Sequence, residues 1–448
     1  MDAKERSFEV SRLLDDFEHD TLSRREFGRR AILLGLGSSF VTAALAAVPP
    51  RASAASPRLG NALNVATISG INSTVTSTLI SRFEAKNPNI KVNLIVIPWT
   101  GIFQKELLAL SARSGQYDVL CQSTSFFPDF AASGFFAPLN QFFSDKKLIN
   151  VEQFDIADFP SSLWDGVGKA NGKLYALPFM QFPQIMYYRS DMVKTHPRTL
   201  DEYMASVKKQ NHPTGMYGTT VQGLKAGAGG DTYAWYPWLF TFGGDIVKNG
   251  KVALNSPEAV ASLEYYVALS KYAPSSSITY GSDQSDVPFL QGHVAQVLEN
   301  SDHWARYVDP KISAVANKVA FDVMPGKSAG EQGTVLTGCW SYGVSAFSPN
   351  QVEAFQFITY LSSKEAMPVY VAAGGLPPRI SALTNQAYQK AYPVFTWVEK
   401  ALHHAKGIPP VKNYLAIENA LEDAIDYALT GQKTPKQALD AVQKQFSS

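Results

Sequence analysis

Short apolar runs alternate with helical stripes of apolar residues in the first part of the chain. The runs at 61–68, 92–98 and 117–120 have the length and side chains of buried strands, whereas apolar residues at 75–83 and 102–110 recur with helical spacing. This strand–helix–strand order with short connections predicts an α/β fold with a mainly parallel sheet covered by helices. Ligands of such folds bind beyond the carboxyl ends of the strands. Three loops follow those ends, at 69–72, 99–101 and 121–127.

A second series of elements begins after residue 173. Strands are predicted at 174–178, 185–189 and 217–221, with a helix at 200–209. The chain contains no tandem repeat, low-complexity tract or long linker, so we expect two closely connected cores. Further helices are predicted at 257–272, 351–362, 364–373, 384–404, 413–429 and 434–446.

The first 54 residues have the features of an export signal. A basic stretch that contains Arg24 and Arg25 is followed by an apolar run at 31–48 and by small residues at 52–55. The paired arginines resemble the twin-arginine signature, which an export receptor reads and which does not anchor the protein. A retained membrane helix and an ordinary buried helix are the alternatives. We expect a soluble periplasmic protein, which the twin-arginine machinery exports and from which residues 1–54 are then removed.

The composition restricts the function. The 448 residues include 40 Lys+Arg and 39 Asp+Glu, which gives a net charge of +1, and 45% are apolar. These values exclude a disordered chain and a basic protein that binds nucleic acid. Eight basic and eight acidic residues lie within 1–54, so the exported body keeps 32 basic and 31 acidic residues. Near-neutrality fits a receptor for uncharged ligands.

The chain contains two cysteines, Cys121 and Cys339. Two are too few for a disulfide scaffold, and their spacing excludes a CxxC zinc or redox motif. An oxidising destination makes a bridge between them conceivable. We expect free thiols.

Several segments resemble, in the same order, segments of the bacterial extracellular solute-binding proteins of the carbohydrate (family 1) type. These proteins serve ABC importers. The segment 114–119 (SGQYDV) is similar to one of the family's elements, and 172–178 (GKLYALP) followed by 186–189 (MYYR) is similar to its crossing strand. Leu200 stands where the family has tryptophan. The remaining similar segments are 79–84, 87–92, 132–139, 197–202, 240–244, 289–292, 338–340 and 374–379. The resemblance covers nearly all of 60–446.

This resemblance implies a two-lobed periplasmic binding protein fold that is similar to type II. The chain crosses between the lobes, and the ligand binds in the cleft between them. By analogy, one lobe contains 59–180 plus 319–341, and the other contains 181–318 plus 342–448. The crossings are expected near Met180, Lys318 and Ser341. The resemblance further implies a non-catalytic monomer without cofactor or metal, which delivers a neutral carbohydrate or sugar alcohol to a membrane permease.

A polyhydroxylated ligand needs aromatic faces against its C–H surface and amides, carboxylates or arginine forks for its hydroxyl groups. Aromatic residues make up 12% of the chain. Those that we expect to contact the ligand are Trp99, Trp235, Trp304 and Trp340. The polar candidates are Asn72, Ser125, Gln181, Asp231, Asn300, Asp302 and Arg379. Core packing for Trp235, helix capping for Asp231 and a surface salt bridge for Arg379 are the competing roles.

Other functions have weaker support in the sequence. There is no GxSxG nucleophile motif and no HExxH zinc helix. A glycosidase would need two carboxylates at a set separation, which the sequence does not indicate. Ferric iron would need converging tyrosines, but Tyr187 and Tyr188 alternate in a strand and Tyr265 and Tyr266 lie inside a helix. A peptide, polyamine or phosphate ester remains an alternative ligand.

Overall fold

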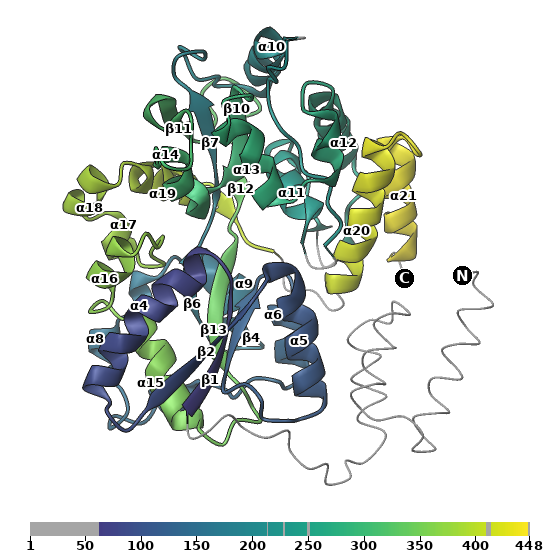
Figure 1. The fold of residues 1–448 in the computed structure, drawn as a ribbon. Helices are drawn as coiled ribbons and strands as arrows, with labels where there is room; N and C mark the ends of the chain where they lie inside the picture. The colour runs from purple at the N-terminus through teal and green to yellow at the C-terminus, as the bar shows by residue number, and fades with distance from the viewer. Residues whose placement is uncertain (1–61, 213, 227–228, 249–250, 409–413, 447–448) are drawn as a thin grey trace.

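The computed structural model describes residues 62–212, 214–226, 229–248, 251–408 and 414–446 (Figure 1). The expected export signal, with Arg24 and Arg25, lies outside these residues. Among the described helices, none combines the length and the apolar character needed to cross a membrane.

The larger sheet has five strands in the order β2-β1-β3-β13-β6. β1 (Ala62–Ile68) pairs in parallel with β2 (Lys91–Ile97) and β3 (Val119–Ser123). β13 (Cys339–Val344) runs antiparallel to β3 and to β6 (Ala176–Gln181). The sheet is therefore mainly parallel, as predicted, with one antiparallel strand that returns from far along the chain.

Helices cover this sheet because each presents an apolar face to it. α4 (Ile71–Lys86) buries Val75, Leu79 and Phe83, and α5 (Trp99–Ser111) also packs on β1. α15 (Gln351–Leu361) packs on β13, and α9 (Ser161–Val167) packs on β6. The other elements of this lobe are α6 (Phe127–Ala132), α7 (Asn140–Phe143), α8 (Val151–Phe154), η1 (Ile156–Asp158), β4 (Lys169–Ala170), β5 (Lys173–Leu174) and α16 (Met367–Ala372).

A second lobe lies above the first in Figure 1 and contains a three-stranded antiparallel sheet. Its middle strand β7 (Gln184–Arg189) pairs with β10 (Gln296–Asn300) and β11 (Val319–Asp322). α11 (Asp231–Thr241) packs on α12 (Pro257–Ser270) and on α20 (Tyr414–Leu429). The remaining elements are α10 (Leu200–Gln210), β8 (Val247–Lys248), β9 (Lys251–Val252), η2 (Ser275–Thr279), α13 (Ser282–Leu290), η3 (Ser301–His303), α14 (Trp304–Val308), η4 (Ala316–Lys318), β12 (Val335–Leu336), α17 (Ile380–Leu383), α18 (Gln386–Ala391), α19 (Val394–Leu402), β14 (Ala405–Lys406), α20 (Tyr414–Leu429) and α21 (Pro435–Gln445).

The strand pairing differs from the expected division at two segments. Val319–Asp322 was expected in the first lobe, but it forms β11 on the edge of the smaller sheet. The segment after Ser341 was expected in the second lobe, but β13 continues to Val344 within the larger sheet, and α15 packs against β13 and α4. Backbone hydrogen bonding and the apolar face of α15 determine both placements.

Two further expectations concern local structure. The predicted strand at 217–221 is reduced to an isolated bridge between Tyr217 and Val294. Cys121 and Cys339 are both buried free thiols, and burial raises the pKa of each. The expectation of free thiols is confirmed.

Candidate functional site

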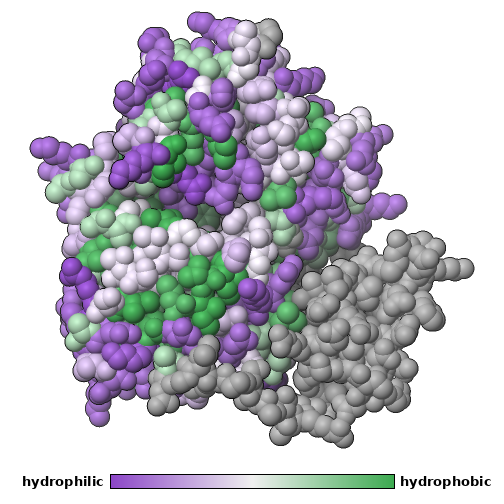
Figure 2. All heavy atoms as spheres, in the orientation of Figure 1, coloured by the Kyte–Doolittle hydropathy of each residue, from purple (hydrophilic) through white to green (hydrophobic). Residues whose placement is uncertain are grey.

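A cavity of about 500 Å³ lies between the lobes and is lined by residues of both. Figure 2 shows the surface hollowed between the lobes, with hydrophilic side chains along the upper edge of the hollow. The first lobe contributes the predicted loops at the strand ends, through Ser69, Trp99, Ser123 and Phe126. The carboxyl ends of β1, β2 and β3 therefore border the cavity, where binding sites of parallel sheets occur.

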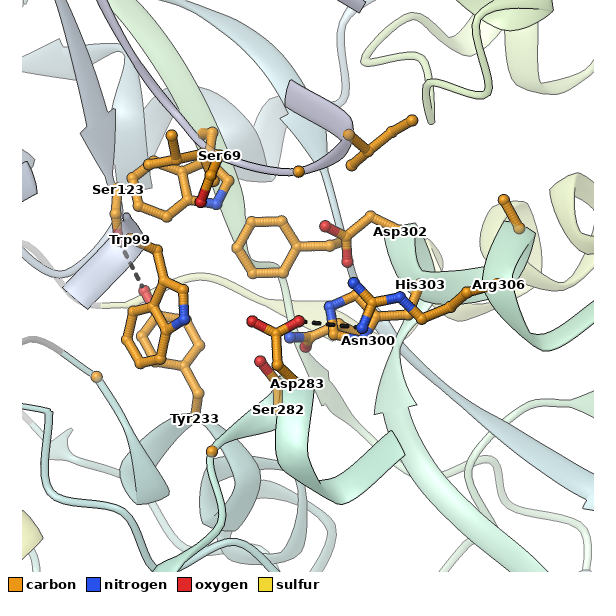
Figure 3. A pocket seen from close by; sticks show the side chains of 18 of the residues that line it. Ser69, Trp99, Ser123, Tyr233, Ser282, Asp283, Asn300, Asp302, His303 and Arg306 are labelled. Carbon is orange, nitrogen blue, oxygen red and sulfur yellow. Dashed lines mark hydrogen bonds and ion pairs between the residues drawn. The ribbon is translucent and has the colours of Figure 1, made fainter. Parts of the chain in front are cut away.

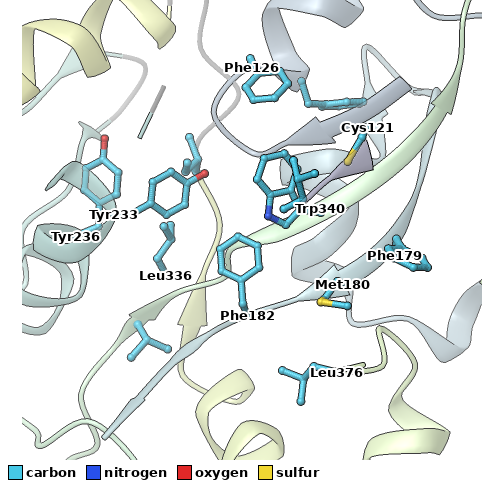
Figure 4. Packing of buried hydrophobic residues seen from close by; sticks show 14 of the residues in the cluster. Cys121, Phe126, Phe179, Met180, Phe182, Tyr233, Tyr236, Leu336, Trp340 and Leu376 are labelled. Carbon is cyan, nitrogen blue, oxygen red and sulfur yellow. The ribbon is translucent and has the colours of Figure 1, made fainter. Parts of the chain in front are cut away.

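Several aromatic rings line the cavity. Figure 4 shows Phe126, Phe182, Tyr233 and Trp340 among the packed side chains. The rings of Trp340 and Phe126 meet edge to face, with centroids 6.2 Å apart. The rings of Phe182 and Tyr233 have centroids 6.5 Å apart. Gly338 makes room for this arrangement, because a Cβ atom there would lie only 2.1 Å from the Phe182 ring. Such rings offer apolar faces that suit C–H surface.

Polar and charged side chains of the second lobe face these rings (Figure 3). Asn300 ends β10, and the turns that follow it carry His303 and Arg306 into the lining. The Nη1 atom of Arg306 lies 3.0 Å from an Asp283 oxygen and 2.7 Å from an Asp286 oxygen. These two carboxylates hold the guanidinium at the cavity wall, where its planar donors are suited to paired oxygen atoms.

Buried charges next to this wall shift one another's protonation. Burial opposes a charge on His303, but Asp286 and Asp302 together outweigh it and raise the pKa of His303 to about 10. Burial, together with the charge of Asp286, raises the pKa of Glu299 to about 8. Burial also raises the pKa of Asp302. At neutral pH the lining therefore contains a protonated His303, and the raised pKa of the adjacent buried Glu299 favours its protonated form.

One group of side chains in the described part of the chain has ligand atoms close enough to hold a metal ion. Asp286, Glu299 and His303 bring their ligand atoms within 4.8 Å of one another. However, Asp286 already contacts Arg306, and the Nδ1 atom of His303 lies 2.9 Å from Asp286. Arg306 and His303 thus already neutralise the Asp286 carboxylate that a metal ion would need. The group is therefore poorly suited to hold a cation.

Four of the eleven predicted ligand contacts line the cavity: Trp99, Asn300, Asp302 and Trp340. They come from both lobes, so the fold brings them together. Seven do not line it and are buried elsewhere: Asn72, Ser125, Gln181, Asp231, Trp235, Trp304 and Arg379.

Arg379 requires the largest correction. Its side chain is fully buried and forms an ion pair with Asp158 at 3.1 Å. The Nε atom donates to the carbonyl of Ser362 at 2.6 Å, and Nη2 donates to the carbonyl of Phe154 at 2.7 Å. The guanidinium has partners for its donors inside the first lobe and is therefore not directed at the cavity.

The other six lie outside the lining for similar reasons. Gln181 donates to the carbonyl of Pro377 at 2.6 Å, and Trp304 packs edge to face on Tyr392. Ser125 donates to Tyr233 at 3.1 Å. Asn72 is buried on α4, and Asp231 and Trp235 are buried on α11.

Several lining residues were not among the predicted contacts. No sequence motif marked Arg306, His303 or Asp283 as a ligand contact. The available signal was the position of Arg306, which follows Asp302 at the helical i,i+4 spacing. Phe126 lies within the predicted loop 121–127, so its position after a strand end was an available signal. Gln222 and Phe182 had no distinguishing pattern.

Residues 71–368 match the family of bacterial extracellular solute-binding proteins. Among the relatives is the mannitol-binding protein of Pseudomonas aeruginosa, which is 24% identical over 414 residues, covering 85% of this chain and 91% of that protein. A probable ABC transporter-binding protein of Deinococcus radiodurans is 25% identical over 65% of this chain and 72% of that protein.

Solved structures have the same two-lobed fold. A solute-binding protein of Agrobacterium radiobacter K84 in complex with ribitol superposes with a TM-score of 0.78 at 26% identity, covering 88% of this chain and 99% of that chain. One from Agrobacterium vitis S4 with bound D-mannitol has a TM-score of 0.74 at 25% identity, covering 86% and 97%. With its two lobes, the cavity between them and the matched residues, the chain belongs to the bacterial extracellular solute-binding protein family.

Proposed function

We propose that the protein binds a neutral sugar or sugar alcohol in the cavity between its lobes and delivers it to the membrane permease of an ABC importer. The observation that carries this proposal is the composition of the cavity, which pairs an aromatic side with a polar side in about 500 Å³. Relatives that bind mannitol and ribitol support the same ligand class.

Each side of the cavity suits one part of such a ligand. Trp99, Trp340 and Phe126 would pack against the C–H surface, and Asn300, Asp302 and Arg306 would hydrogen-bond the hydroxyl groups. The Oδ1 atom of Asp302 is buried and has no hydrogen-bond partner within the protein. A ligand hydroxyl would satisfy that oxygen, which favours a ligand rich in donors.

The charges of the lining favour a neutral ligand over an ion. Asp283, Asp302 and Asp309 are opposed by Arg306 and by protonated His303. The two cationic side chains would repel a polyamine, and the carboxylates would repel a phosphate ester. We also infer that the protein turns over no substrate, because the matched family consists of solute-binding proteins and the Asp283 carboxylate, one of the acids that a glycosidase pair would need, is engaged by Arg306.

The proposed route to the permease begins with export. The basic stretch with Arg24 and Arg25, followed by an apolar run, supports passage through the twin-arginine machinery into the periplasm. There the protein would act as a monomer. Ligand binding would favour the closed arrangement of the lobes by its greater affinity for that arrangement, and the permease would recognise both lobes together.

Titration calorimetry of the exported chain tests the ligand class. We expect saturable binding of at least one compound from a panel of ribitol, mannitol, glucose and maltose, and none of spermidine, a tripeptide, glucose 6-phosphate or ferric citrate. Saturable binding of only a charged compound would contradict the proposal. Release of free sugar from a nitrophenyl glycoside over many turnovers would contradict the absence of catalysis.

A further inference from the structure

Tyr233 connects the lobes while its ring lines the cavity. The residue lies in the first turn of α11, in the second lobe, and its side chain is 9% exposed. Its hydroxyl group contacts three hydroxyl side chains at the end of β3 in the first lobe. The distances are 3.3 Å to Ser123 and 3.1 Å to Ser125, with a further short contact to Thr124. Figure 3 shows the hydroxyl of Tyr233 pointing at Ser123 at one side of the cavity.

Ser125 makes a second connection to the same lobe. Its hydroxyl lies 3.3 Å from the Oε1 atom of Glu418 on α20. That oxygen also accepts from Tyr414 at 3.1 Å and from Thr232 at 3.3 Å, both in the second lobe. Ser125 and Glu418 are completely buried. The hydroxyl groups of the first lobe are therefore held by two helices of the second.

The backbone beside these contacts packs closely against both side chains. Gly229 has a φ of 98°, which favours glycine, and a Cβ atom there would lie 2.1 Å from the Tyr233 ring and 2.8 Å from the Ser125 hydroxyl. The loop thus approaches both partners closely. A hydrogen bond between buried hydroxyl groups contributes a net stabilisation although water replaces it on opening, so the contacts between Tyr233 and Ser123–Ser125 favour the approach of the two lobes.

We propose that Tyr233, Thr124, Ser125 and Glu418 form an inter-lobe clasp, in which Tyr233 is the positioning residue that couples the ligand cavity to lobe closure. A ligand that packs against the Tyr233 ring holds its hydroxyl toward the first lobe. The clasp bonds then form together with the ligand contacts, and the clasp must open before the ligand leaves. The coupling to ligand rests on the proposed function, whereas the bonds between lobes do not.

The test uses the exported chain with spectroscopic labels at two exposed positions, Lys105→Cys on α5 and Lys209→Cys on α10. Tyr233→Phe removes one hydroxyl group and keeps the ring. We expect a longer mean inter-lobe distance without ligand, and ligand dissociation about fivefold to twentyfold faster with little change in association. Ser125→Ala, which lies outside the cavity lining, should produce the same two changes.

Tyr203→Phe is the matched control. Its hydroxyl is buried but contacts Thr219 at 3.0 Å within the second lobe, so its loss should lower stability without changing distance or dissociation. In the double variant Tyr233→Phe/Ser125→Ala, the rate of ligand dissociation should increase by no more than the product of the two separate increases. Both substitutions remove the same hydrogen bond.

Two results distinguish the clasp from the ligand class. Wild-type distances and dissociation rates in both Tyr233→Phe and Ser125→Ala would overturn the clasp, even if mannitol or ribitol binds. If no compound of the panel binds, the proposed function fails. The inter-lobe distance without ligand still tests the clasp. An unchanged distance in both variants then overturns the clasp, and a longer one supports it.

Discussion

The Nη1 atom of Arg379 lies 3.1 Å from the Oδ2 atom of Asp158, in a part of the first lobe that is closed to solvent. The guanidinium also lies over the rings of Phe154 and Phe159, 4.9 and 4.3 Å from their centroids. Its position joins the segment after α8 to the chain that follows α16. A planar cation held by an ion pair, carbonyls and rings acts as a structural anchor.

Replacing Arg379 should therefore change stability rather than ligand binding. Arg379→Ala leaves the buried Asp158 carboxylate with only the more distant Lys364, whose Nζ atom is 3.9 Å away, and we expect the free energy of unfolding to fall by about 3–5 kcal/mol. Ligand affinity of the folded fraction should stay within twofold of wild type. Urea denaturation and calorimetry at a temperature where the variant is folded measure both quantities. A variant with wild-type stability and tenfold weaker binding would refute the structural role.

Trp99 should contribute to ligand affinity without supporting the core. It begins α5, lines the cavity and is only partly buried. Trp99→Ala removes an aromatic face from the ligand, and we expect affinity to fall about tenfold to hundredfold, which corresponds to about 1.4–2.8 kcal/mol. Calorimetry measures the affinity, and thermal unfolding of the free protein should change by only a few degrees.

Trp397→Ala provides the matched control for this prediction. Trp397 lies on α19, is also partly buried and does not line the cavity. Its replacement should leave affinity unchanged. Equal losses of affinity in both variants would mean that the effect of Trp99 is a general loss of packing.

The strand ends explain which site residues the sequence could predict. Trp99 follows the predicted strand at 92–98 directly, and the edge of a parallel sheet places such a residue at the cavity whatever the detailed packing. Asn300 is the last residue of β10, which was not among the predicted strands. Arg306 lies one helical turn beyond Asp302, and its direction depends on carboxylates from α13. That ion-pair geometry arises from distant segments, so no local pattern indicated it.

Burial explains why some of the predicted ligand contacts do not line the cavity. The aromatic segment that contains Trp235 was expected to face the ligand in part, but α11 is enclosed by α12, α20 and β12, which bury almost all of its side chains. Only Tyr233, in its first turn, reaches the cavity. The lobe boundaries were also misjudged at β11 and α15, because strand order in a sheet depends on which edge is open and the sequence does not specify that.

Export should depend on the arginine pair itself rather than on its charge. Replacing Arg24 and Arg25 with lysine keeps both positive charges but removes the feature that the twin-arginine receptor reads. We expect the double variant to accumulate uncleaved in the cytoplasm, whereas Lys4→Arg, as a control for sequence change in the same segment, should be exported normally. Cell fractionation and immunoblotting measure the distribution. Normal periplasmic levels of the double variant would rule out this route.

Two buried glutamates should make stability depend on pH. Burial raises the pKa of Glu418 from an ordinary value of 4.5 to about 8, with a further increase from Glu422, and Glu299 also reaches about 8. In each case the folded protein binds the proton more tightly than the unfolded chain. The stabilisation is therefore fully present below pH 4.5 and is lost as pH rises through 8. His303, with a pKa of about 10, acts in the same direction between pH 6.5 and 10.

Glutamine imitates a protonated glutamate, so substitution should remove this dependence. Between pH 5 and 9 we expect the wild-type free energy of unfolding to decrease by roughly 2–4 kcal/mol for each glutamate. Glu418→Gln and Glu299→Gln should each flatten the curve by one such contribution, whereas Glu152→Gln, at an exposed position on α8, should leave it unchanged. Urea denaturation at intervals of one pH unit measures the slopes. A wild-type curve whose slope matches the slopes of both glutamine variants would contradict the raised pKa of both carboxylates, because a group that binds its proton more tightly in the folded protein lowers stability as pH rises.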